Sequence, residues 1–171
     1  MPNDDWPMIA IVRAPPSSTY TRPLVAVLDS GMGSYRKQIN IRTAAEGAIV
    51  DLTSTLEEAL RDSGFQEGLL CAFVPHSTCA LFTIENEGGL QKDMRDALQR
   101  LMPKDIEYEH HLRWGDGNGH SHIRASFLGQ SLVIPFHQGK LDLGTWQQPV
   151  LMELDTRGRD RRLIVQIIGD H

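Results

Sequence analysis

The pattern of apolar and polar residues becomes regular at about residue 35. Residues 36–42 alternate between the two types, which is the period-2 pattern of a half-buried strand. Residues 69–74 and 79–84 are short apolar runs, and each predicts a buried strand. Only a short turn separates these two runs, so we expect them to pair with each other.

Two segments show the spacing of amphipathic helices. Residues 53–63 place apolar side chains on one face, with Asp51 or Thr53 as a candidate N-cap and Gly64 as the stop. Residues 89–101 repeat this pattern, and the proline that follows ends the second helix.

The rest of the chain has the character of strands separated by glycine-containing turns. The predicted strands are residues 122–128, 132–136, 140–145, 150–155 and 163–168. Strands before and after two main helices predict a single α+β domain over residues 35–171, with a mostly antiparallel, β-sandwich-like sheet. Residues 1–34 contain five of the nine prolines, so we expect a partly irregular N-terminal extension.

Composition narrows the classes of partner. A chain of 171 residues fits one domain, and a net charge of −5 with a pI near 5.8 disfavours nucleic acid and anionic membranes as partners. The acidic, proline-broken N-terminus is unlike a signal peptide, so we expect a cytoplasmic protein. Cys71 and Cys79 lie in apolar runs and are expected to be free thiols. The arginines at residues 157–162 are interpreted as a solvated turn.

Histidines provide the strongest chemical signal. Five of the seven fall between His76 and His122. The glycine-rich turn at residues 115–119 leads directly into the predicted strand. If His120 and His122 lie at the start of this strand, they share one face, with Cα atoms about 6.5 Å apart. Catalytic zinc sites use three protein ligands and keep one position open, and the candidates for the third ligand are His76 and one of the adjacent pair His110 and His111, of which His110 is preferred.

Other polar residues are candidates beside them. Glu85-Asn86 follows a strand, where the pair can orient a histidine, bind a hard cation or simply cap the next helix. The glycine-rich turn can present backbone N–H groups to an anion, with Asp116 as a candidate ligand for a hard cation, or it can be a plain turn. Arg124 is placed to complete a phosphate site. Trp146 can stack on a heteroaromatic ring or belong to the core.

Five ordered motifs then support a resemblance. They are His76-Ser77-Thr78, Glu85-Asn86, Tyr108-Glu109-His110, Asp116 to Ser126, and Leu143 to Gln147. In this pattern the chain resembles the YjbQ-like family, also known as the secondary thiamine-phosphate synthase family. It departs from the family pattern at Ile84, Gly88-Gly89, Arg124 and Gln148-Pro149.

The resemblance implies a homotrimer with a histidine-rich pocket at a subunit interface and a bound divalent metal, zinc or magnesium. It implies coupling of a pyrimidine-methyl diphosphate to a thiazole phosphate. The alternatives are a non-catalytic protein that binds a metal or a small phosphorylated ligand, and a metal-dependent phosphoester hydrolase. The expected catalytic residues are His76, Glu85, Asn86 and His122; the expected substrate contacts are Asp116, Gly117, Asn118, Arg124, Ser126, Trp146 and Gln147; the expected metal ligands are His110, His120 and His122.

Overall fold

The computed structural model describes residues 32–171, and the prediction of an irregular extension falls almost entirely outside this range. Gly33 and Ser34 already belong to the first strand. The elements in chain order are β1 (Gly33–Arg42), β2 (Ile49–Asp51), α1 (Thr53–Ser63), β3 (Glu67–Phe73), β4 (Cys79–Ile84), α2 (Gly88–Leu101), α3 (Glu109–Trp114), α4 (Gly119–Leu128), β5 (Ser131–His137), β6 (Lys140–Leu141), β7 (Gln148–Glu153) and β8 (Asp160–Asp170).

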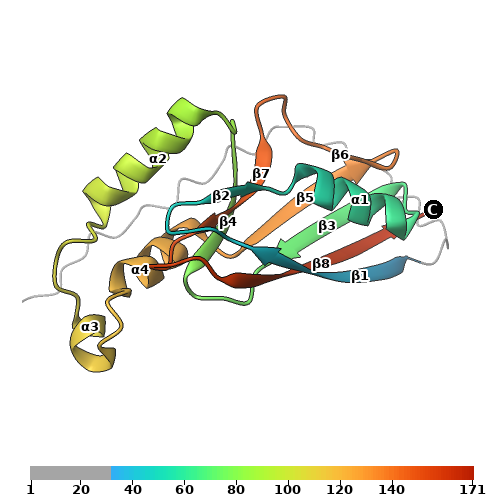
Figure 1. Ribbon diagram of the computed structural model, residues 1–171. Helices are drawn as coiled ribbons and strands as arrows, with labels where there is room; N and C mark the ends of the chain where they lie inside the picture. The colour runs from blue at the N-terminus through green and yellow to red at the C-terminus, as the bar shows by residue number, and fades with distance from the viewer. Residues whose placement is uncertain (1–31) are drawn as a thin grey trace, which may run out of the picture.

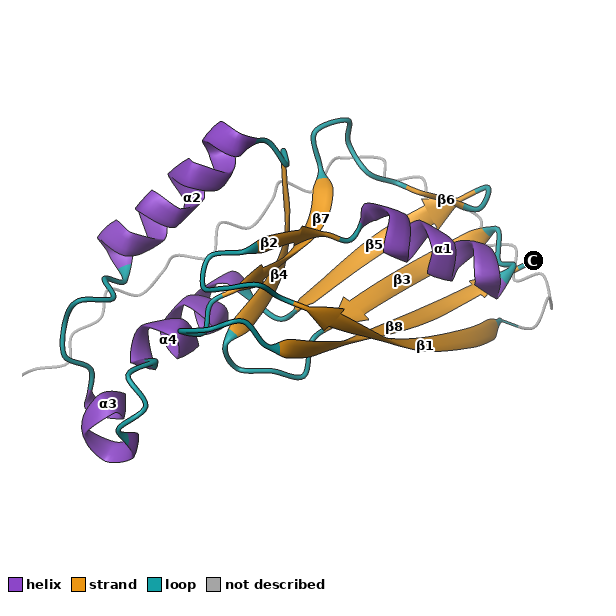
Figure 2. Ribbon diagram, in the orientation of Figure 1, coloured by secondary structure: helices purple, strands orange, loops and turns teal. Residues whose placement is uncertain are grey.

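The strands form two antiparallel sheets within one α+β domain (Figure 1). The larger sheet has the order β1-β8-β3-β5-β6, and the smaller sheet has the order β2-β7-β4. Helix α1 lies along the larger sheet, whereas α2, α3 and α4 gather at the other end of the domain (Figure 2). The α+β class and the antiparallel architecture agree with the prediction.

The smaller sheet is buried on both faces, and its central strand β7 shows why. Leu151 belongs to the main core, which also contains the apolar face of α1 and the inner face of the larger sheet. Its neighbour Met152 points to the opposite side and packs in a second cluster with Leu98 of α2 and Ala125 of α4. Alternation along one strand therefore joins the two cores.

Helix α1 forms where the pattern predicted it. Its buried residues Leu56, Ala59 and Leu60 follow the 3.6-residue period. Asp51 Oδ1 accepts a hydrogen bond from the Thr53 backbone N–H at 2.8 Å, and Gly64 ends the helix in the left-handed conformation.

The pairing of β3 with β4 was predicted wrongly. β3 lies between β5 and β8 in the larger sheet, and β4 pairs with β7 in the smaller one. Residues 74–78 thus connect the two sheets. The prediction failed because both strands are apolar enough to be buried, and the period of the apolar residues does not specify which strand is the partner. Cys71 and Cys79 are free thiols, as expected.

Residues 122–128 were predicted as a strand, and this is also wrong. They belong to helix α4, whose buried positions include His120, Ser121, Arg124 and Ala125, a helical spacing. The predicted strand 140–145 is reduced to β6, because residues 144–147 form a turn in which Gln147 N donates to Gly144 O at 2.9 Å. Helix α3 lies between the second predicted helix and the glycine-rich turn, in a segment where the sequence pattern predicted no helix. No helix within residues 32–171 is long and apolar enough to cross a membrane.

Candidate functional site

A polar cleft of about 440 Å³ lies where three connections meet. The turn after β3 contributes residues 75–78, the start of α4 contributes Asn118 and His122, and a third group comes from the β7–β8 connection and the first residues of β8. This last group consists of Asp155, Arg159, Asp160 and Arg161.

Arg161 of the cleft lining forms a buried ion pair with Glu153. Glu153 faces inward from β7, Arg161 faces inward from β8, and their side chains are 0% and 5% exposed. Arg161 Nε donates to Glu153 Oε2 at 2.8 Å, and a second bond joins Arg161 Nη2 to Glu153 Oε1. Thr43 Oγ1 adds a 2.6 Å hydrogen bond to the same carboxylate. Two charges at this depth are tolerated because each is hydrogen-bonded on several sides.

The same arginine holds the turn that carries His76. Arg161 Nη2 donates to both the backbone oxygen and the hydroxyl of Thr78, each at 3.0 Å. His76 Nε2 in turn accepts the backbone N–H of Arg162 at 2.9 Å. Burial lowers the pKa of His76, and the charges of Arg161 and Arg162 lower it further. His76 is therefore a neutral imidazole whose proton resides on Nδ1.

Asp155 provides a fixed negative charge in the wall. Burial opposes its ionisation, but the Thr156 N–H and the Arg159 guanidinium outweigh this effect and lower its pKa. Arg159 Nε donates to Asp155 Oδ2 at 2.9 Å, and Thr78 Oγ1 donates to the same oxygen at 3.3 Å.

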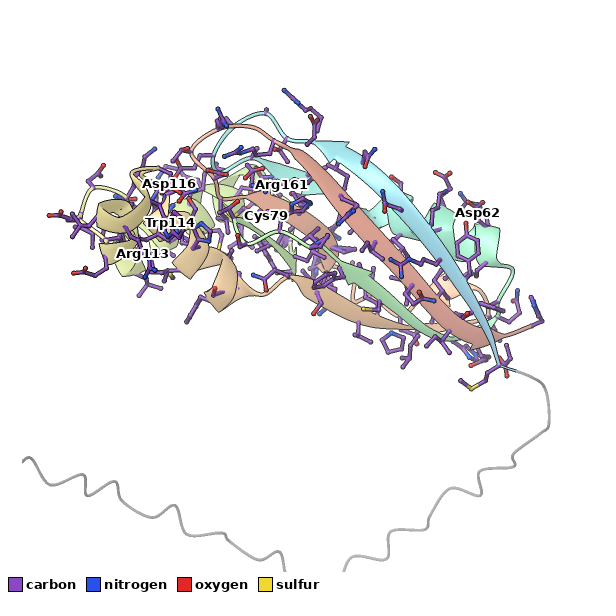
Figure 3. All side chains as sticks on the ribbon, turned by 90° about the horizontal axis from the view of Figure 1, so that it is seen from below. Asp62, Cys79, Arg113, Trp114, Asp116 and Arg161 are labelled. Atoms are coloured by element: carbon purple, nitrogen blue, oxygen red, sulfur yellow. The ribbon has the colours of Figure 1, made fainter. Side chains whose placement is uncertain are left out.

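His122 lines the cleft and contacts a second imidazole, that of His110. Their ring centroids are 4.5 Å apart with a 34° angle between the planes. Burial lowers the pKa of His122, and His110 lowers it further. Asp116 Oδ1 is 3.2 Å from His110 Nδ1, a buried atom without a well-aligned hydrogen bond. Figure 3 shows Asp116 with Trp114 at the end of the domain far from Asp62 of α1.

His120 points to the other side of α4. Residues two apart on a helix differ in direction by about 200°, so the strand-based expectation that His120 and His122 converge is wrong. His120 is 0% exposed, and its Nε2 lies 3.0 Å from Glu46 Oε1. Arg124, expected to bind phosphate, is committed to the same region: Nη1 donates to Glu46 at 3.3 Å and Nη2 donates to Met102 O at 2.8 Å.

Glu85, Asn86 and Trp146 lie away from the cleft. His76 precedes β4 and Glu85 follows it, and a six-residue strand spans about 17 Å. Asn86 Nδ2 donates to Asp51 Oδ2 at 3.0 Å, and the N-cap of α2 is Glu87 and not Asn86. Trp146 is 67% exposed beside the start of β7. One chain therefore does not bring all the predicted site residues together.

The predicted metal ligands do not fit a metal centre within one chain. His110 and His122 are neighbours, but His120 is occupied with Glu46 on the opposite side of the helix. Among residues 32–171, no group of three or more histidine, cysteine or acidic side chains has the arrangement of a metal site. The described chain thus supplies two adjacent imidazoles and not the three-ligand set of a catalytic zinc.

Remaining predicted contacts have mainly local roles. Gly117 adopts a left-handed turn conformation, and the side-chain amide group of Asn118 lies 3.0 Å from Asp116 Oδ1. Ser126 lies beside Ile123 and Phe127 on the outer surface of α4, and Gln147 Oε1 accepts the Gly144 N–H at 2.8 Å.

The sequence pattern did not predict the charged residues Arg161, Glu153 and Asp155 as part of the site. Arg161 was interpreted as part of a solvated turn, yet it has the same parity as the buried residues Leu163 and Val165 of β8. Extending that alternation by one position toward the N-terminus is the signal that identifies it. Glu153 and Asp155 gave no comparable signal.

The fold and these motifs belong to a known family. The profile of the UPF0047 protein YjbQ-like family matches residues 37–170, and the chain belongs to this family. A UPF0047 protein of Methanothermobacter thermautotrophicus is 38% identical over 138 residues, covering 81% of this chain and 94% of that protein. The UPF0047 protein YjbQ of Escherichia coli O157:H7 is 31% identical over 137 residues, covering 80% and 99%.

Solved structures show the same fold. A YbjQ-like protein of unknown function from Sulfolobus solfataricus superposes with a TM-score of 0.77 at 35% identity, covering 82% of this chain and 100% of that one. A hypothetical protein from Aeropyrum pernix K1 has a TM-score of 0.73 at 31% identity, covering 80% and 99%.

We predict that stability falls as the pH is lowered from 7 to 5. Burial is the largest cause that lowers the pKa values of His76, His120 and His122 below the ordinary 6.5. These residues are neutral in the fold but take up protons in the unfolded chain, so the stabilisation is present above pH 6.5 and is lost below it. The free energy of unfolding, measured with denaturant at each pH, should fall with a definite slope between pH 7 and pH 5. His122→Gln should make this slope shallower.

The control is Leu101→Gln, which changes an exposed, non-titratable residue of α2 and should leave the slope unchanged. A slope that is equally steep in His122→Gln and the wild type would contradict the assignment.

Proposed function

We propose that the protein binds a small phosphorylated molecule in the His76–His122 cleft. The observation that carries this proposal is the gathering of two arginines and two histidines around one polar cavity of about 440 Å³. Guanidinium groups and imidazole N–H groups are strong donors to phosphate oxygens. An anionic ligand would also raise the pKa values of both histidines, which burial and neighbouring charges now lower.

Individual donors have different freedom. Arg161 is fixed by Glu153 and Thr78 and contributes mainly charge and shape. Arg159 is partly exposed and has one guanidinium nitrogen outside its contacts with Asp155, so it can turn toward a ligand. His76 has its Nδ1–H as donor because Nε2 is occupied by the backbone.

We propose further that the bound molecule is a diphosphate and that the protein is a thiamine-phosphate synthase-type transferase, as the sequence resemblance implies. In that reaction the C–O bond between the pyrimidine methylene and the diphosphate breaks, and the thiazole nitrogen forms a new C–N bond to the same carbon. Diphosphate leaves with the bonding electrons. The free guanidinium nitrogen of Arg159 and the Nδ1–H of His76 would stabilise the leaving group by hydrogen bonds, and the walls would orient the two reactants.

The proposed reaction also uses predicted site residues that lie outside the cleft of the same chain, and a neighbouring subunit of an oligomer would supply them. Glu85, Asn86 and Trp146 are at the far end of β4 and β7, so they would reach a cleft only on a neighbouring subunit. The surface beside His122 is apolar and exposed: Phe127 is 71% and Ile123 45% exposed. Exposed apolar patches of this kind mark interaction surfaces. We propose a homotrimer in which this surface of α4 packs against the next subunit.

The ligand prediction is tested by titrating inorganic diphosphate into the full chain in a calorimeter. Arg159→Ala and His76→Ala should each weaken binding at least tenfold, which is the loss of about one charge-assisted hydrogen bond. His137→Ala, an exposed histidine outside the cleft, should bind like the wild type.

The transferase step is assayed in parallel with both thiamine precursors. The wild type should form product, and His122→Ala and Glu85→Gln should form at least tenfold less. Diphosphate binding without product would leave a binding protein, and the absence of binding in the wild type would contradict both roles.

The assembly prediction is tested by light scattering of the full chain. The wild type should have the mass of three chains, and Phe127→Asp should shift it toward a single chain of 19.2 kDa, because a buried unpaired carboxylate disfavours association. Leu101→Asp alters a residue of α2 that is 67% exposed and should leave the trimer intact. A wild-type mass of one chain would contradict the proposal.

A further inference from the structure

The outer face of the larger sheet carries an unusual apolar surface. Side chains of β3, β5 and β8 that point away from the core are largely aliphatic or aromatic, and several are 41–61% exposed. The outer apolar surface consists of Leu69, Phe73, Val133, Pro135, Ile164 and Ile168. Helix α1 and the smaller sheet pack against the inner face, so no element of residues 32–171 covers this one (Figure 2).

Strand register aligns part of this surface into a row. Leu69 of β3 is the direct partner of Ile168 of β8 and of Pro135 of β5. The neighbouring strand β1 presents polar residues on the same side, such as Arg36 opposite Gln166. The apolar surface therefore has a definite edge, as expected of a site that one occupant covers.

The row ends in a hollow at the point where the described chain begins. This cavity of about 420 Å³ is lined by Met32, Leu69 and Ile168 together with the adjacent backbone. Met32 is 74% exposed and is the first described residue. The preceding segment is thus tethered directly beside the apolar surface.

That preceding segment has a sequence suited to the surface. Residues 24–28 read Leu-Val-Ala-Val-Leu, an apolar run separated from Met32 by Asp29, Ser30 and Gly31. The match to the family profile begins only at residue 37, so this run is additional to the family domain.

We propose that residues 24–28 of this chain dock in an extended conformation across the outer apolar surface. An extended five-residue run covers about 13 Å, and three neighbouring strands span about 10 Å. The run is therefore long enough to cross all three strands. Leu24, Ala26 and Leu28 would face the row formed by Pro135, Leu69 and Ile168.

The tether favours this occupant over a second copy of the chain. A three-residue connection gives an effective concentration in the millimolar range or above, whereas a second copy must associate from solution. Burial of Leu24 and Leu28 against this surface would remove two large apolar side chains from water, which favours docking.

Cys71 provides a reporter for the test. It lies on the outer face of β3 between Val133 and Gln166, next to the row. The second thiol, Cys79, is fully buried, and burial raises its pKa to about 11, so it does not compete for a thiol reagent. The full chain is labelled with a bulky aromatic disulfide, and the rate is compared with that of a Leu24→Asp/Leu28→Asp variant.

We expect Cys71 in the variant to react at least tenfold faster than in the wild type. The matched control, Ile9→Asp/Ile11→Asp, makes the same change in the other apolar run of the N-terminal residues and should keep the wild-type rate. Equal rates in the wild type and the Leu24/Leu28 variant would overturn the proposal. If Cys71 is labelled slowly in both the wild type and the Leu24/Leu28 variant, and faster when either protein is diluted, a second copy of the chain covers the surface. That result would also overturn the proposal. A fast rate in the Ile9/Ile11 control would overturn the assignment to residues 24–28.

Discussion

The buried ion pair between Arg161 and Glu153 connects the parts of this fold that matter for its chemistry. It joins β8 of the larger sheet to β7 of the smaller sheet, and through Thr43 and Thr78 it also fixes the end of β1 and the turn after β3. A buried pair of this kind contributes little net stability compared with apolar residues, but losing one partner is costly. Its value here is geometric, because it positions the backbone on which His76 lies.

The cleft inherits its electrostatic character from this arrangement. Positive charge on Arg161 and burial both keep His76 neutral, and burial together with His110 does the same for His122. Each neutral imidazole keeps one N–H that can donate to an anionic ligand, and the ligand's charge would raise the pKa of the imidazole so that it can take up a second proton. The proposed ligand chemistry follows from this combination, whereas a three-histidine metal centre within one chain does not, because α4 turns His120 toward Glu46.

The sequence predicted those elements whose periodicity is unambiguous. Helix α1 and the strands β1, β3 and β4 follow directly from apolar spacing and a glycine stop. α4 was misread because its histidines two residues apart imitate strand alternation, and only the packing of Ala125 against the smaller sheet resolves the period. Strand partners were equally hidden, since the two sheets are assembled from segments far apart in the sequence.

The candidate site was predicted in part for a related reason. His76, Asn118 and His122 do meet at one cleft, because turns and helix starts concentrate polar residues at strand ends. Arg161 escaped notice because the alternation of β8 was not extended to it, and Glu153 because charged residues are rarely fully buried. Glu85 and Asn86 follow β4 at its far end, a strand length away from this cleft.

The most direct test of this account is the free energy of unfolding in a double-mutant cycle on Arg161 and Glu153. Glu153→Leu and Arg161→Met should each lower stability by about 3–5 kcal/mol, because each leaves a buried charge unpaired. The double variant should lose much less than the sum, since neither charge remains. Single losses below about 1 kcal/mol that simply add in the double variant would contradict the central role given to this ion pair.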